Sequence, residues 1–207
     1  MRAFVTGTDT GVGKTYVTAL LTRSLRAAGL DTVALKPVCC GERDDAEILR
    51  AAADDELTLD EVNPIWFRTP VAPLVASRME GGEVSVGGLG EWFARVAAGR
   101  KSVLVEGAGG WLVPLADGST MADLAARLDL PVVLVVANRL GCINHTLLTL
   151  ESISSRGLTC DGIILNSLNG AIDDSVCTNR EILVETSGVP VLFETGLGEQ
   201  QLDLAVV

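Results

Sequence analysis

Residues 3–15 read Ala-Phe-Val-Thr-Gly-Thr-Asp-Thr-Gly-Val-Gly-Lys-Thr, and this stretch decides the fold. A short apolar run ends at Gly7, and a glycine-containing loop then closes on Gly13-Lys14-Thr15. From Tyr16 to Ala28 the chain is rich in Ala and Leu and contains neither Gly nor Pro. This order predicts a strand, a phosphate-binding loop and a helix in succession.

The loop suits a phosphate group, which needs many hydrogen-bond donors at once. Small residues let backbone N–H groups converge on phosphate, and the helix N-terminus adds partial positive charge. Lys14 would reach the outer phosphates, and the Thr15 hydroxyl would bind Mg²⁺. Five residues separate Gly7 from Gly13, one more than in the standard pattern, which indicates a variant branch of the phosphate-loop proteins. An ordinary glycine-rich turn is the alternative.

Composition narrows the class of protein. Hydrophobic residues make up 48% of the chain and aromatic residues only 4%, which favours an aliphatic core. The net charge of −11 disfavours nucleic-acid binding, which needs a basic surface. The cysteines form no C-x-x-C pair, so a zinc site is not expected. Neither a secretory signal nor a membrane-spanning run is found, and we expect a cytoplasmic protein with a single domain over residues 1–207 and no membrane partner.

Apolar runs and helical patterns alternate along the chain. The runs are rich in Val, Ile and Leu without interleaved polar residues, which is typical of strands buried on both faces. This alternation predicts a three-layer, doubly wound α/β fold of the phosphate-loop NTPase type with a mostly parallel sheet. Strands are predicted at residues 3–6, 32–35, 102–105, 131–137, 162–165 and 190–193, and helices at 15–28, 44–53, 89–98, 121–128, 146–156 and 175–186. The Pro- and Gly-rich stretch 63–88 is predicted to be an irregular excursion.

In parallel sheets ligands bind beyond the carboxyl ends of the strands, so the residues after each strand are the candidates for chemistry. Lys36 follows the second strand and needs an anion if it is buried, although it could instead extend into solvent. Asp44 and Asp45 begin a helix, where they could cap it or face Mg²⁺-bound phosphate. Glu106 ends the third strand before a run of small residues, which suits a metal-facing carboxylate; a chance surface glutamate is the alternative.

Two later turns also follow strands. The turn 138–146 leads into a helix whose free N–H groups could bind an anionic group. It contains His145, the only histidine, which we interpret as structural. Asn166 and Ser167 follow the fifth strand, where a side-chain amide could contact a nucleotide base or simply form a turn.

Four of these segments together resemble the dethiobiotin synthetase family. In the order of the family they are Val5–Thr15, Lys36-Pro37-Val38, Val105–Gly110 and Leu140–His145. The first and third are shared with related phosphate-loop amidoligases, whereas the other two are more specific. The resemblance covers the chain to about Ser167.

The resemblance implies ATP-dependent closure of a ureido ring in biotin biosynthesis. The diamine 7,8-diaminononanoate takes up CO₂ as a carbamate, whose oxygen attacks the γ-phosphate of ATP or another nucleoside triphosphate. The second amine then closes the ring and phosphate leaves. The resemblance also implies a homodimer with the site at the subunit interface.

The resemblance assigns roles to individual residues. Lys36 and Lys14 are the catalytic cations, and Thr15, Asp45 and Glu106 surround Mg²⁺. The expected nucleotide-binding residues are Gly11, Val12, Gly13, Lys14, Thr15, Tyr16, Asp45, Glu106, Gly107, Ala108, Gly109, Asn166, Ser167, Gly196, Leu197 and Gly198. The expected substrate-binding residues are Thr10, Cys40, Pro70 and Gly110, joined by Gly141, Cys142, Ile143 and Asn144 from a second subunit.

Three departures from the family pattern leave alternatives open. Cys40 stands where a hydroxyl residue often contacts substrate, and a thiol is a weaker donor. The connection from Lys36 is short, so Asp44 and Asp45 both remain candidates for the metal. The segment 194–198 replaces a proline-containing base-binding loop, which leaves the preferred base open.

Other functional classes also use phosphate loops. A corrinoid-type amide synthetase usually carries a glutaminase domain, for which this chain has neither the length nor a suitable Cys-His pair. A partition-type ATPase often carries a membrane- or DNA-binding element, which the net charge of −11 and the lack of a basic amphipathic helix disfavour. The run Asn138-Arg139-Leu140-Gly141 lacks the aspartate of a GTPase base motif.

Overall fold

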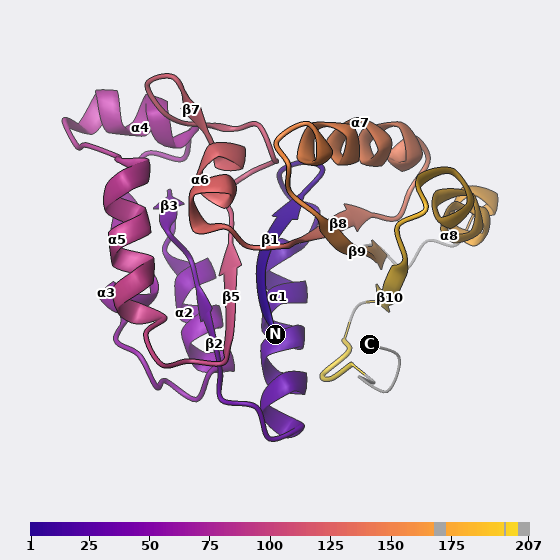
Figure 1. Ribbon diagram of the computed structural model, residues 1–207, viewed down its shortest axis with the longest axis horizontal. Helices are drawn as coiled ribbons and strands as arrows, with labels where there is room; N and C mark the ends of the chain where they lie inside the picture. Colours follow the sequence, from indigo (N-terminus) through magenta and orange to yellow (C-terminus); the bar gives the residue numbers. More distant parts are fainter. Residues whose placement is uncertain (168–172, 197, 203–207) are drawn as a thin grey trace.

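The computed structural model describes residues 1–167, 173–196 and 198–202. Its centre is a six-stranded parallel sheet with the strand order β10-β9-β8-β1-β5-β2 (Figure 1). The six strands are β1 (Arg2–Gly7), β2 (Thr32–Leu35), β5 (Ser102–Glu106), β8 (Val132–Ala137), β9 (Cys160–Ser167) and β10 (Val191–Gly196). All six lie where the apolar runs predict them.

The strands form because their side chains can be buried on both faces of the sheet. Every residue of β2 and β5 is buried, and so are the first five of β8. Residues such as Phe4, Leu104 and Leu134 are fully enclosed. Burial on both faces explains why the sequence of these strands shows no polar alternation.

Helices cover the sheet on both sides. They are α1 (Lys14–Ala27), α2 (Asp44–Ala52), α3 (Leu59–Val62), α4 (Pro73–Glu80), α5 (Val86–Val96), α6 (Met121–Leu128), α7 (Cys142–Ser154) and α8 (Asp174–Ser187). In Figure 1, α2, α3 and α5 lie toward the β2 edge, whereas α7 and α8 lie toward β9 and β10. The doubly wound α/β fold is therefore confirmed. None of the helices in the described ranges is both long enough and apolar enough to cross a membrane.

The stretch 63–88 is not the irregular excursion that its Pro and Gly content predicts. It contains β4 (Ile65–Phe67), which pairs with β3 (Val38–Cys40), followed by α4 and the start of α5. Pro73 stands at the first position of α4, where its missing N–H costs nothing, and Gly81 ends the helix at φ 72°. Proline and glycine here mark the ends of a helix. Only short connections, at 63–64, 68–72 and 81–85, lie outside these elements.

The strand order places the phosphate loop at the centre of the sheet. β1 lies between β5 and β8, while the next strand along the chain, β2, lies at the sheet edge beyond β5. Such a reversal of winding direction opens a crevice at the carboxyl ends of the strands. Gly13 caps α1 in the left-handed region at φ 86°. This conformation favours glycine and turns the chain from the loop directly into the helix.

A second small pair of strands, β6 (Pro114–Ala116) and β7 (Ser119–Thr120), is antiparallel and precedes α6. It lies near α4 in Figure 1, and Arg78 of α4 forms an ion pair with Asp117 of the intervening turn. This contact joins the segment after β5 to the segment 68–80, and both segments line a cavity described below.

Gly162 on β9 tests how tightly the sheet edge is packed. A β-carbon at this position would lie 2.3 Å from Cγ of Leu192 on β10. We expect Gly162→Ala to lower the free energy of unfolding by about 1–3 kcal/mol, because Leu192 must shift. Gly87→Ala in α5 is the matched control, since the nearest atom to its new β-carbon lies 3.6 Å away. Thermal unfolding of both variants checks the prediction. A melting temperature of Gly162→Ala equal to that of Gly87→Ala would contradict it.

Candidate active site

The loops after β1, β2 and β5 meet at the carboxyl end of the sheet. They bring together Lys14, Lys36 and Glu106, with Thr15 from the start of α1 and Asp45 from the start of α2. Adjacent parallel strands explain this convergence, because β1 pairs with β5 and β5 pairs with β2.

Lys36 is the centre of the cluster. Its Nζ donates to Oε1 of Glu106 at 2.5 Å and to Oδ2 of Asp45 at 2.8 Å. It also contacts the carbonyl oxygen of Gly107 at 3.4 Å. Lys36 is only 3% exposed, which rules out a lysine that extends into solvent. The amide of Asn63 donates to the Lys36 carbonyl at 2.8 Å and holds the backbone in place.

The two carboxylates keep Lys36 charged. Burial by itself would lower the pKa of Lys36, but the charges of Glu106 and Asp45 outweigh burial and raise that pKa above its usual value. Burial likewise would raise the pKa of Asp45, and the Lys36 charge lowers it instead. The Lys36 ammonium is therefore a fixed positive charge at neutral pH.

Lys14 lies in a different electrostatic environment. Its Nζ donates to the carbonyl oxygen of Asp9 within the loop at 3.2 Å. Burial, together with repulsion from Lys36, lowers the pKa of Lys14 to about 8. Nearby carboxylates oppose this shift without cancelling it. An anion beside Lys14 would relieve the repulsion, which suits a site for phosphate.

The pKa of Lys14 predicts that ADP binding depends on pH. Lys14 carries its charge below about pH 8 and loses it above, so ADP affinity should be flat near neutral pH and fall by up to tenfold per pH unit above about pH 8. Titration calorimetry from about pH 7 to about pH 9.5 checks this result. An affinity that stays constant over that range would contradict it, because a lysine with an unperturbed pKa loses its charge only near pH 10.

Glu106 fits a divalent cation. The Thr15 hydroxyl donates to its Oε1 at 2.8 Å, whereas its Oε2 is buried and accepts no hydrogen bond from any described residue. Carboxylate and hydroxyl oxygens are the ligands that Mg²⁺ prefers, and such sites commonly use one or two carboxylates together with substrate phosphates. No group of three or more His, Cys, Asp or Glu side chains arranged to hold a metal occurs within the described ranges.

The geometry distinguishes the two neighbouring aspartates. Asp45 accepts a hydrogen bond from Lys36 and lines the cavity described next. Asp44 is exposed at the first position of α2, where a carboxylate favours the helix N-terminus. The structure thus brings Asp45, and not Asp44, to the cluster.

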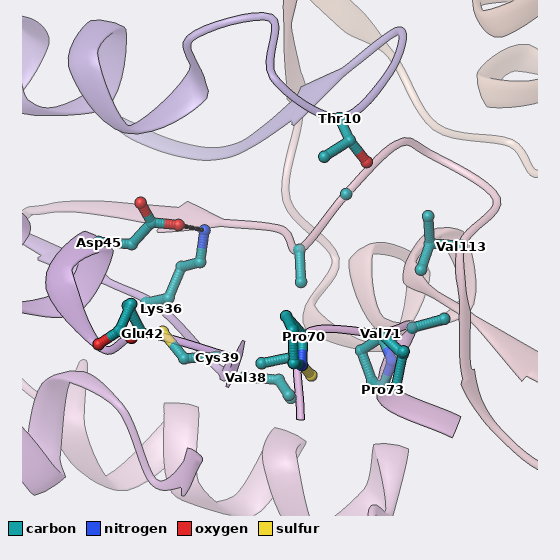
Figure 2. Close-up of a pocket in the computed structure, with 14 residues that line it drawn as sticks. Thr10, Lys36, Val38, Cys39, Glu42, Asp45, Pro70, Val71, Pro73 and Val113 are labelled. Carbon is teal, nitrogen blue, oxygen red and sulfur yellow. Dashed lines mark hydrogen bonds and ion pairs between the residues drawn. The ribbon is translucent and has the colours of Figure 1, made fainter. Parts of the chain in front are cut away.

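A cavity of about 430 Å³ adjoins the cluster, and we call it the Lys36 cavity. In Figure 2 the Lys36–Asp45 pair lies at one end, and Val113 and Pro73 lie at the other. The cavity is therefore charged at one end and largely apolar along its walls. It is lined by Thr10, Lys36, Val38, Cys39, Cys40, Glu42, Asp45, Pro70, Val71, Ala72, Pro73, Ala108, Gly109 and Val113.

Cys40 also lines this cavity, and its thiol is neutral at neutral pH. Burial raises the pKa of Cys40 to about 11, with a further contribution from Glu80. Glu80 also accepts hydrogen bonds from the backbone N–H groups of Arg68 and Thr69, which fixes the loop that carries Pro70. Cys40 can therefore act as a weak S–H donor.

A second cavity of about 310 Å³ lies beside the phosphate loop, and we call it the Asn166 cavity. It brings Gly11 and Val12 together with Asn166 and Ser167. The remaining lining residues are Thr10, Ala137, Asn138, Arg139, Asp173 and Val176. The hydroxyl of Tyr16 donates to the Gly196 carbonyl at 2.6 Å, so Tyr16 joins α1 to the end of β10.

Some expected site residues lie elsewhere. Gly110 lines a separate cavity of about 400 Å³ with Thr8, Trp111 and Leu148. Gly198 is exposed, and Leu197 lies outside the described residues. Gly107 is buried and contributes its carbonyl oxygen to Lys36.

The turn at the start of α7 does not line the Lys36 cavity of the same chain. None of the described residues lining that cavity comes from the expected substrate-binding set at positions 141–144. Gly141 precedes the helix at φ 90°, Cys142 is buried, and Asn144 and His145 are exposed. Leu140, just before the turn, is 81% exposed.

Comparison with known proteins decides the family. Residues 1–195 match a family model described as an AAA domain. An ATP-dependent dethiobiotin synthetase of Akkermansia muciniphila is 46% identical over 208 residues, which span 100% of this chain and 98% of the relative. Another from Anaeromyxobacter sp. (strain K) is 50% identical over 180 residues, or 85% of this chain and 81% of the relative. The chain belongs to the dethiobiotin synthetase family.

Solved structures with the same fold are less similar in sequence to this dethiobiotin synthetase family member than the synthetases above. The septum site-determining protein MinD of Pyrococcus horikoshii OT3 is 18% identical with a TM-score of 0.56, over 95% of this chain and 82% of that protein. A ParA family ATPase of Chlorobium tepidum is 12% identical with a TM-score of 0.57, over 96% of this chain and 85% of that one. These likenesses confirm the phosphate-loop NTPase fold. Sequence identity to the synthetases separates the chain from the partition-type class.

Some residues that line the Lys36 cavity of this dethiobiotin synthetase family member could not be recognised from the sequence. Glu42, Val71, Pro73 and Val113 line it without belonging to a recognised motif. Pro73 could have been found from its place at a helix start, next to the expected Pro70. Val113 carries no sequence signal, because its position depends on the path of the chain after Gly110.

Proposed function

We propose that this chain catalyses the ATP-dependent conversion of 7,8-diaminononanoate and CO₂ to dethiobiotin, ADP and phosphate. The observation that carries the proposal is the position of Lys36. It lies between two carboxylates, close to the phosphate loop, at the charged end of a cavity whose other lining residues are mostly apolar. A diamine with an alkyl tail and a carbamate head matches that combination of charge and apolar surface.

The proposed substrate lies in the Lys36 cavity. Its alkyl chain would contact Pro70, Val71 and the neighbouring apolar walls, and its carbamate would face Lys36. Thr10 and Cys40 supply a hydroxyl and a thiol beside it. Glu42 and Asp45 lie at the same cavity and can attract the cationic amines of the diamine before the carbamate forms.

The proposed nucleotide site extends from the phosphate loop to the Asn166 cavity. Backbone N–H groups from Gly11 to Thr15 would bind the phosphates, assisted by the charge of Lys14. Asn166, Ser167 and the segment after β10 would contact the base. The proximity of Thr10 to both cavities supports a shared wall between nucleotide and diamine.

Mg²⁺ would be held by Thr15, Asp45 and Glu106 together with phosphate oxygens. Its charge would neutralise the charge that builds on the phosphate oxygens as phosphoryl transfer proceeds. The buried Oε2 of Glu106, which has no partner among the described residues, supports this assignment.

The proposed chemistry has two bond-forming steps. A carbamate oxygen attacks the γ-phosphorus, the bond to the β-phosphate oxygen breaks, and ADP leaves. The second amine then attacks the carbonyl carbon of the resulting carbamic–phosphoric anhydride, a proton is lost, and phosphate departs with the former carbamate oxygen. Lys14 and Lys36 oppose the negative charge on the transferring phosphoryl group and on the carbamate.

We further propose that the site is completed in a homodimer. The start of α7 offers helix-terminal N–H groups that suit the substrate carboxylate, although the N–H of Cys142 already donates to the carbonyl oxygen of Arg139 at 3.1 Å. This turn does not line the Lys36 cavity of its own chain. A second copy would have to supply Gly141, Cys142, Ile143 and Asn144. The exposed side chains of Leu140, Leu148 and Leu112 near this turn and its neighbouring cavity support burial against a second copy.

Phosphate release tests the proposal. Purified protein is supplied with MgATP, bicarbonate and 7,8-diaminononanoate, and each component is omitted in turn. We expect phosphate release and dethiobiotin formation only when all are present. Phosphate release that does not depend on the diamine would overturn the proposed function. So would a lack of phosphate release when ATP is replaced by each of the other nucleoside triphosphates as well.

A further inference from the structure

The side-chain amide of Asn166 is held from two sides. Its Nδ2 donates to the carbonyl oxygen of Val12 at 2.9 Å, and its Oδ1 accepts from the hydroxyl of Thr195 at 3.0 Å. Asn166 is 1% exposed and Thr195 is 2% exposed, so water does not compete strongly for these bonds. The three residues belong to the phosphate loop, the end of β9 and the end of β10.

The two contacts determine which way the amide points. A backbone carbonyl can only accept a hydrogen bond, so the nitrogen end must face Val12. The oxygen end then faces Thr195, whose hydroxyl donates to it. An amide has two N–H donors and two acceptor lone pairs in all. One N–H and one lone pair of Asn166 consequently have no partner among the described residues, and Asn166 lines the Asn166 cavity.

One donor and one acceptor in fixed positions discriminate between purine bases. The edge of adenine that carries N6 and N7 offers a donor and an acceptor, which an asparagine amide matches with two hydrogen bonds. The corresponding edge of guanine offers two acceptors, O6 and N7, so the amide oxygen would face another oxygen. Rotation of the amide would weaken this discrimination.

We propose that Thr195 is a positioning residue that fixes the Asn166 amide and thereby favours adenine over guanine nucleotides. The inference rests on the proposed nucleotide site and adds to it the residue that determines base preference. Thr195 acts through Asn166 alone: no other hydrogen bond of its hydroxyl to a described residue is present. Asn138 lines the same cavity, but its amide is held from α8 by Asn179 and by the carbonyl of Val176. A change at Thr195 therefore leaves Asn138 as it is.

Substitution of Thr195 can distinguish an effect on base preference from a general loss of nucleotide affinity. Asn166 itself is a poor target, because its loss would also release the carbonyl of Val12 in the phosphate loop. Thr195→Val removes the hydroxyl at almost constant volume, and Thr195→Ser retains it. Dissociation constants of ADP, GDP and inorganic tripolyphosphate are measured for each protein by calorimetry, without diamine.

We expect the wild-type protein to bind ADP more tightly than GDP. Thr195→Val should reduce that preference on the order of fivefold, as expected for one lost hydrogen bond, and Thr195→Ser should keep it. Tripolyphosphate should bind all three equally. Three results would overturn the inference. The ratio of the ADP and GDP dissociation constants could be unchanged in Thr195→Val, or this variant could lose affinity equally for ADP, GDP and tripolyphosphate. The third is a Thr195→Ser protein that loses the preference for ADP as Thr195→Val does. A protein that binds ADP selectively but releases no phosphate with the diamine would contradict the proposed function alone.

Discussion

Replacing Lys36 with alanine should lower kcat about a hundredfold to a thousandfold, the loss typical of removing one donor to developing charge. Lys36 is a fixed cation, because Glu106 and Asp45 keep its pKa above the usual value. Without it, the negative charge on the carbamate and the transferring phosphoryl group would lack its counter-charge. Steady-state phosphate release measures the effect, and a near-normal kcat would rule out the proposed role.

The same substitution should also destabilise the protein. Glu106 is fully buried, and removal of Lys36 leaves its carboxylate without the counter-charge it has in the structure. Breaking a buried pair in this way costs about 3–5 kcal/mol. Asp45, whose side chain is 48% exposed, can turn to water and contributes less. Lower activity in Lys36→Ala alone could therefore reflect partial unfolding.

A double variant separates the two effects. Lys36→Ala combined with Glu106→Gln removes the buried charge together with its partner, so most of the lost stability should return while kcat stays low. Lys101→Ala is the matched control, because Lys101 is exposed and is the only other lysine outside the phosphate loop. It should keep both the wild-type melting temperature and the wild-type kcat.

The second large effect is expected for Glu106→Gln. Glutamine keeps the shape of the side chain but removes the charge that would hold Mg²⁺. We expect the Mg²⁺ concentration for half-maximal activity to rise on the order of tenfold or more, with partial recovery of kcat at high Mg²⁺. Activity measured over a range of Mg²⁺ concentrations at fixed ATP checks this result.

Exposed acids provide the control for Glu106. Glu91→Gln on α5 makes the same chemical change on the surface and should leave the Mg²⁺ dependence unaltered. If Glu106→Gln also gives the wild-type Mg²⁺ curve, Glu106 is not a ligand of the metal, and the lack of a partner for its Oε2 among the described residues needs another explanation.

The sheet could be predicted from sequence because burial on both faces leaves a direct signal. Runs such as 132–136 contain only aliphatic residues, which is typical of parallel strands buried on both faces. The helix α4 could not be predicted in the same way. It is short, it begins at Pro73 and ends before Gly81, and its exposed Val75 and Met79 give no clear amphipathic pattern.

The positions of the charged site residues at the carboxyl ends of strands could be predicted to a similar extent. Lys36 follows β2 and Glu106 ends β5, and the pairing of these two strands brings the side chains together. Which aspartate faces Lys36 depends on the exact start of α2, a boundary that sequence patterns fix only to within a few residues. The contact between Asn166 and Thr195 depends on the register of β9 against β10, which the sequence does not reveal.

The central claim is that a carbamate oxygen attacks the γ-phosphate in this site. It predicts that phosphate released during turnover carries an oxygen atom that came from CO₂. Freshly dissolved ¹⁸O-labelled bicarbonate is supplied with the diamine and MgATP, over a time short compared with exchange of the label with water. Mass spectrometry of the phosphate should then find one ¹⁸O per molecule, with the other label in the ring carbonyl of dethiobiotin. Unlabelled phosphate formed alongside labelled dethiobiotin would contradict the account.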